Sequence, residues 1–133
     1  MDSCIDFNNE IFDNERIMER IPFKIIIDDE ELVDLDLEQG QLITKMQNSK
    51  NKIATACPSP HEYMEVFKKC KNNFVVTISE KLSGSHNSAI LAKEMLIEEC
   101  ANNFVRVFDC KTAAAGASLV VLRLKQDLCI SVQ

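Results

Sequence analysis

Two hydroxyl groups and a glycine stand together at Ser83-Gly84-Ser85, where a polar loop leads from a predicted strand into a predicted helix. The first backbone N–H groups of a helix lack partners within it, so an anion such as a phosphate or a carboxylate binds well there. Gly84 would let the backbone approach such a ligand closely, because glycine has no side chain. The alternative is that Ser83 or Ser85 only caps the helix. The segment therefore indicates an anion site, with helix capping as the competing interpretation.

The sequence lacks the patterns of common catalytic, metal and nucleotide sites. A serine nucleophile of the hydrolase type needs G-x-S-x-G, and Lys81 stands where Ser83 would need a glycine. Cys57 has no evident histidine partner in the sequence. The glycines at positions 40, 84 and 116 build neither common phosphate-binding motif, and the six cysteines form no C-x-x-C pair. We therefore expect no catalytic residue, no metal and no cofactor.

Alternating strand and helix patterns must position these residues. Apolar, β-branched runs predict strands at 21–27, 74–78 and 104–108, and helical spacing predicts a weak helix at 8–20 and further helices at 36–48, 60–71, about 85–100 and 111–128. Near-continuous apolar strands that alternate with helices are typical of a mostly parallel sheet with helices on both faces. Ligands collect at the carboxyl ends of such strands, where the polar segments 54–60, 79–89 and 109–112 fall. The fold class is therefore predicted to be α/β.

The predicted helices also have predicted buried faces. For the helix at 60–71 this face comprises Tyr63, Met64, Phe67 and Cys70, and for the helix at about 85–100 it comprises Leu91, Met95 and Leu96. The acidic run at 28–31 is interpreted as a solvated turn after a strand, with a metal or partner patch as the alternative.

Composition gives the class of protein. The chain has 133 residues, 46% hydrophobic and 27% charged, which suits one globular domain. Residues 1–38 carry 13 of the 21 acidic residues and three of the 15 basic ones, which argues against a nucleic-acid partner. No apolar run reaches the ~20 residues that span a bilayer, and no secretory signal follows Met1. We expect a cytoplasmic protein with free, mostly buried cysteines.

Several segments together resemble the DegV family. Residues 2–7 resemble its T-D-S-T-A-D-L opening, residues 21–25 its V-P-L-x-V strand and residues 55–60 its T-S-Q-P-S-P loop. Residues 78–89 are similar to its I-S-S-x-L-S-G-T-Y-Q-S-A segment, residues 107–111 to its V-I-D-S-K, and Gly116 falls in its small-residue helix. The five motifs occur in the family's order over nearly the whole chain.

The resemblance implies a fatty-acid-binding protein that performs no covalent chemistry. It implies that Thr55, Ser83 and Gly84 hold the carboxylate of a long-chain fatty acid, which is a ligand and not a cofactor, and present it to a separate kinase. Ser85 keeps the hydroxyl of the family threonine and His86 replaces a tyrosine, so both are candidates for supporting contacts. We favour a solvent-exposed His86, with a titratable group at the pocket mouth as the alternative.

The resemblance covers only the first domain of the family. Residues 1–133 are expected to form a truncated N-terminal domain that lacks the first strand and the second domain. An alternative function is a sugar-phosphate-binding α/β domain that uses the loop from Ser79 to Ser88, and a third interpretation is a fragment that self-associates through an exposed sheet edge. Transient contact with a membrane surface is compatible with a lipid ligand.

Overall fold

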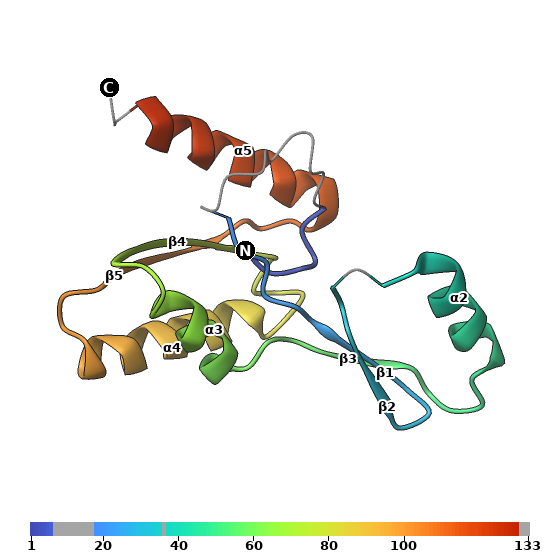
Figure 1. Cartoon of the computed structure of the whole chain (residues 1–133). Coiled ribbons are helices and arrows are strands. Elements are labelled where there is room, and N and C mark those ends of the chain that lie inside the picture. Colours follow the sequence, from blue (N-terminus) through green and yellow to red (C-terminus); the bar gives the residue numbers. More distant parts are fainter. Residues whose placement is uncertain (7–17, 36, 131–133) are drawn as a thin grey trace.

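A computed structural model describes residues 1–6, 18–35 and 37–130 (Figure 1). The predicted helix at 8–20 falls mainly on residues outside these ranges. The elements in chain order are β1 (Lys24–Ile27), β2 (Glu30–Val33), α2 (Gln39–Asn48), β3 (Ala54–Ala56), α3 (Pro60–Phe67), β4 (Asn72–Thr77), α4 (Ser85–Glu99), β5 (Phe104–Asp109) and α5 (Ala114–Ile130).

The centre of the fold is the parallel pair β4–β5, in register from Asn72 opposite Phe104 to Thr77 opposite Asp109. Figure 1 shows α3 and α4 on one side of this pair and α5 on the other. Successive side chains of a strand point to opposite faces. Val75 accordingly joins the core under α3 and α4, whereas Val76 joins the core under α5.

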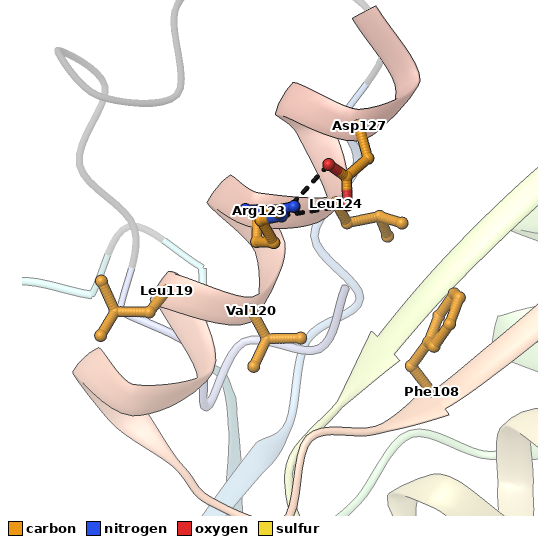
Figure 2. A pocket seen from close by; sticks show the side chains of 6 residues that line it. All are labelled: Phe108, Leu119, Val120, Arg123, Leu124 and Asp127. Carbon is orange, nitrogen blue, oxygen red and sulfur yellow. Dashed lines mark hydrogen bonds and ion pairs between the residues drawn. The ribbon is translucent and has the colours of Figure 1, made fainter. Parts of the chain in front are cut away.

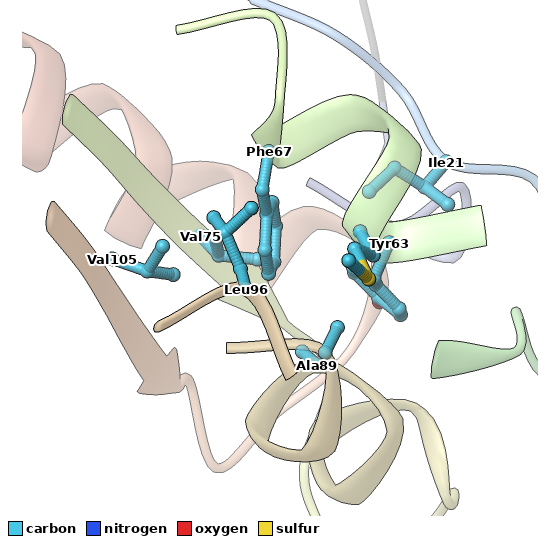
Figure 3. Packing of buried hydrophobic residues seen from close by; sticks show 9 residues of the cluster. Ile21, Tyr63, Phe67, Val75, Ala89, Leu96 and Val105 are labelled. Atoms are coloured by element: carbon cyan, nitrogen blue, oxygen red, sulfur yellow. The ribbon is translucent and has the colours of Figure 1, made fainter. Parts of the chain in front are cut away.

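The larger core lies between the strands, α3 and α4 (Figure 3). Phe67 from α3 and Leu96 from α4 are fully buried there. The small residues Ala89 and Ala92 are also fully buried and let the two helices pack closely. The second core, under α5, contains Ile5, Phe23, Val76, Ile78, Ala117 and Val121.

The beginning of the chain lies along the free edge of β4. The N–H of Asp2 donates to Val76 O at 3.4 Å, and Asp2 forms an isolated parallel bridge with Ile21. The N–H of Ser3 donates to Ile21 O at 3.0 Å. Asp2 is therefore held beside β4, at the side of the pair opposite β5.

The prediction of a mixed α/β fold is confirmed, but that of a mostly parallel sheet is not. Strands β2, β1 and β3 form a separate antiparallel sheet in that order. The physical reason lies at Asp28 and Asp29, whose φ angles of 48° and 69° form a tight turn that folds β2 back onto β1. The predicted acidic turn is thus only half right, because Glu30 and Glu31 belong to β2.

Two predicted helix faces need correction. Leu91 and Met95 were expected to be buried, but they are 50% and 41% exposed, and α4 instead turns Ser85, Ala89, Ala92 and Leu96 inward. In the other helix Tyr63, Met64 and Phe67 are buried as predicted. Cys70 is exposed because α3 ends at Phe67, before the turn that would have buried it.

Candidate functional site

Of the three polar segments predicted to bind ligand, the second and third lie at the carboxyl ends of β4 and β5, whereas the first begins with β3 of the antiparallel sheet. The N–H of Ser79 donates to Thr112 O at 2.9 Å, and the N–H of Glu80 donates to Asp109 Oδ1 at 3.2 Å, which joins the second segment to the third. The first segment meets the second at Cys57, whose Sγ lies 4.0 Å from Ser88 Oγ. The fold therefore brings together residues that lie 29 to 33 positions apart in the sequence.

Ser83 and Gly84 form the start of α4. Gly84 is the N-cap residue and has no side chain, so the competing capping interpretation is reduced to the contact of Ser83 with the first residue of α4. Ser83 Oγ accepts the N–H of Ser85 at 3.2 Å. This bond uses a lone pair of Ser83 and leaves its O–H to donate elsewhere.

Gly84 lies in a tight contact with Cys57 but has an ordinary backbone conformation. Its φ of −71° suits any residue, but a Cβ at this position would lie 3.3 Å from Cys57 Sγ. The missing side chain therefore lets Cys57 of the first loop approach the start of α4, and the predicted approach of the Gly84 backbone to a ligand stays a prediction.

Thr55 lies in β3, where it pairs with Ile25, and it is exposed. The loop that follows is held by a capping box at the start of α3. Ser59 Oγ accepts the N–H of Glu62 at 3.2 Å, and Glu62 Oε2 accepts the N–H of Ser59 at 2.7 Å. This hydrogen bonding lowers the pKa of Glu62, which keeps the carboxylate ionised in the capping box.

His86 is half-buried, so the favoured prediction of a solvent-exposed side chain is wrong. Its Nδ1 lies 3.1 Å from Oγ1 of Thr77, the last residue of β4. Thr77 is fully buried, and this hydrogen bond draws the ring towards the strand end. Thr77 was missed in the sequence because it lies inside an apolar strand pattern.

Buried polar side chains lie behind the candidate anion site. Asp2 Oδ2 accepts the hydroxyl of Ser85 at 2.7 Å and the N–H of Ile78 at 3.0 Å. The Tyr63 hydroxyl lies 2.6 Å from Ser85 Oγ. Ser85 is fully buried, and its supporting role stays a prediction, whereas Asp2 and Tyr63 were not among the predicted site residues.

Two carboxyl groups near the site have pKa values shifted in opposite directions. Burial raises the pKa of Asp2, an effect that the hydrogen bonds from Ser85 and Ile78 partly offset. The N–H of Lys111 lowers the pKa of Asp109, which remains ionised. Asp109 would oppose a bound anion, and the raised pKa of Asp2 limits the negative charge behind the site.

The raised pKa of Asp2 predicts a specific pH dependence of stability. Between the ordinary value of 3.8 and the raised value, the folded chain retains a proton that the unfolded chain has released. The stability contributed by Asp2 is therefore complete at low pH and is lost as the pH rises through the raised pKa. Relative to the non-titrating Asp2→Asn variant, the unsubstituted chain should lose free energy of unfolding as the pH rises from 3.8 through the raised pKa of Asp2.

Urea denaturation of both chains at several pH values measures this difference. The neighbouring thiols of Cys4 and Cys110 do not interfere, because burial raises their pKa values, that of Cys4 to about 12. A stability difference that stays constant over the range would contradict the raised pKa of Asp2.

An open hollow of about 390 Å³ lies between β5 and α5 (Figure 2). Its walls are mainly apolar, and an ion pair between Arg123 and Asp127 lies on the α5 side. The lining residues are Phe108, Leu119, Val120, Arg123, Leu124 and Asp127. This set contains no predicted site residue, so the predicted carboxylate contacts lie outside the hollow.

Within the described ranges, no cluster of three or more His, Cys, Asp or Glu side chains could hold a metal ion. Over the same residues, no helix is long and apolar enough to cross a bilayer. The described cysteines, at positions 4, 57, 70, 100 and 110, are free. They are half-buried or exposed, so the prediction of mostly buried thiols is wrong for them.

The structure is a mixed α/β fold in which candidate site residues lie at the carboxyl ends of a parallel strand pair. A family model described as "Uncharacterised protein, DegV family" matches residues 1–127. The chain belongs to the DegV family, and the resemblance seen in the sequence motifs is confirmed.

Individual relatives agree with this assignment. A DegV domain-containing protein from Streptococcus gordonii is 38% identical over 126 residues, which cover 94% of this chain and 42% of that protein. A crystal structure of a DegV family protein from Ruminococcus gnavus, described with vaccenic acid, gives a TM-score of 0.90 at 35% identity, covering 98% of this chain and 47% of that one.

The name of a third relative refers to a fatty acid kinase. The Streptococcus pneumoniae Fatty Acid Kinase (Fak) B3 protein, loaded with linoleic acid, gives a TM-score of 0.75 at 33% identity, covering 85% of this chain and 41% of that one. The chain thus spans less than half the length of these relatives.

Proposed function

We propose that this chain binds a long-chain fatty acid and holds its carboxylate with Thr55, Ser83 and Gly84. The observation that carries the proposal is the geometry of Ser83, which stands at the start of α4 and whose oxygen accepts the N–H of Ser85, so that its O–H is left to donate. A carboxylate accepts strong, charge-assisted hydrogen bonds from such a hydroxyl and from helix N–H groups. The ligands named for the relatives from R. gnavus and S. pneumoniae support it.

The proposal assigns a binding role without catalysis. The site would hold the carboxylate for a separate kinase, as the name of the S. pneumoniae relative suggests. We place this binding in the cytoplasm, because free thiols are typical of a reducing compartment. The alkyl tail would contribute about 0.8 kcal/mol for each buried CH₂.

Extraction of the purified 133-residue chain with organic solvent, followed by mass spectrometry, tests the proposal. We expect co-purified long-chain fatty acid in an amount that approaches one molecule per chain. Thermal unfolding with added fatty acid or added sugar phosphate separates the two candidate ligand classes. A folded chain that carries no lipid and is stabilised only by sugar phosphates would overturn the proposal.

A further inference from the structure

Asp2 is a buried carboxyl group that connects three segments of the fold. It is fully buried beside β4, and its Oδ2 accepts both the Ile78 N–H, just beyond the end of β4, and the Ser85 hydroxyl, in the first turn of α4. Burial of a carboxyl group is costly unless hydrogen bonds compensate for the lost hydration. The two hydrogen bonds that Asp2 accepts therefore help to hold the segments around it in place.

The hydroxyls of Ser85 and Tyr63 form a directed chain of hydrogen bonds that ends at Asp2. Ser85 Oγ donates to Asp2 Oδ2, so the Tyr63 hydroxyl, 2.6 Å from Ser85 Oγ, is the donor in the remaining contact. All three residues are fully buried. The chain thus fixes Ser85 by its side chain from two directions, through α3 and through the segment beside β4.

The fixed position of Ser85 also restrains Ser83. Its backbone N–H donates to Ser83 Oγ at 3.2 Å, so the position of the Ser85 backbone decides how the Ser83 hydroxyl is oriented. Gly84 lies between them and moves with both. Small displacements of ligand-binding groups have large effects on recognition.

We propose that Asp2, together with Tyr63, is a positioning residue that acts through Ser85 to orient Ser83 and Gly84 towards a carboxylate. The inference rests on the proposed function and deepens it, because it assigns the support of the carboxylate contacts to a buried hydrogen-bond network. Two members of this network, Asp2 and Ser85, lie 83 positions apart in the sequence. The raised pKa of Asp2 is consistent with the low hydration of this network.

The test compares affinities for a long-chain fatty acid and for the alcohol of equal chain length. The ratio of the two affinities reports on carboxylate recognition and is insensitive to a general loss of stability. Ser85→Ala should lower the ratio about tenfold, whereas Ser85→Thr keeps the hydroxyl and should retain it. Asp2→Asn and Tyr63→Phe change the network with little change in volume and should lower the ratio by smaller factors.

Val105→Ala is the matched control, because Val105 is buried in the core and makes no part of this network. It should lower the melting temperature and leave the ratio unchanged. Folded Ser85→Ala, Asp2→Asn and Tyr63→Phe variants that all keep the original ratio would overturn the inference while leaving the proposed function intact. Failure of the unsubstituted chain to bind the fatty acid would overturn both.

Discussion

Substitution of Ser83 by alanine is expected to weaken binding of a long-chain fatty acid by about ten- to a hundredfold. The variant removes the hydroxyl whose oxygen accepts the N–H of Ser85 and whose hydrogen would donate to the carboxylate. A hydrogen bond to a charged group is worth about 1.5–3 kcal/mol, and each 1.4 kcal/mol changes affinity about tenfold. Titration with a fluorescent fatty acid, or its displacement by the natural one, measures the dissociation constant.

Ser118→Ala provides a matched control for this prediction. The Ser118 hydroxyl also makes a short hydrogen bond, to Asp6 O at 2.7 Å. It lies on α5, outside the polar segments 54–60, 79–89 and 109–112. We expect its affinity to equal that of the unsubstituted chain. Equal affinities for the Ser83→Ala and Ser118→Ala variants would remove Ser83 from the binding site.

The parts of the fold with strong local patterns were predictable from the sequence. The runs at Asn72–Thr77 and Phe104–Asp109 are rich in Phe and Val, with Arg106 interrupting the second, and they form the parallel pair. Ser59 and Glu62 stand three positions apart and form the capping box that their spacing indicates. These features depend on residues close together in the sequence.

Other parts depend on partners distant in the sequence and leave no local pattern. Strand β3 is Ala-Thr-Ala, which carries little strand preference. It forms because one edge of β1 is open for pairing, with Ile25 opposite Thr55. In α4 the apolar residues Leu91 and Met95 lie outside, because close packing against α3 favours alanines on the inner face. Periodicity alone does not distinguish these two faces.

The candidate site shows the same division. Ser83 and Gly84 stand out because a loop, a glycine and a helix start coincide in one short segment. The partners of Ser85 were missed, since Asp2 lies 83 positions away and Tyr63 lies 22 positions away in a helix with an apolar pattern. Only the packing of α3 and α4 on the strands brings these hydroxyls and the carboxyl group together.

Substitution of Phe67 by alanine is expected to lower the free energy of unfolding by about 3–5 kcal/mol. Phe67 is 1% exposed, at the end of α3, and its ring centroid lies 5.8 Å from that of Tyr63. The loss comprises the transfer free energy of the ring and the cavity left between α3 and α4. Domains of this size have a total stability of about 5–15 kcal/mol, so this variant should unfold at a much lower urea concentration.

Phe104→Ala distinguishes the effect of burial from that of ring pairing. Phe104 also has an aromatic partner with a centroid distance of 5.8 Å, Phe74, but it is 50% exposed on β5. Its removal leaves no closed cavity, so we expect a loss of about 1 kcal/mol. Urea denaturation of both variants gives the comparison, and similar losses would contradict the assignment of the core to the space between α3, α4 and the strands.

Because α3 also carries Tyr63, the Phe67 variant should in addition weaken the restraint on Ser85 and with it the preference for a carboxylate.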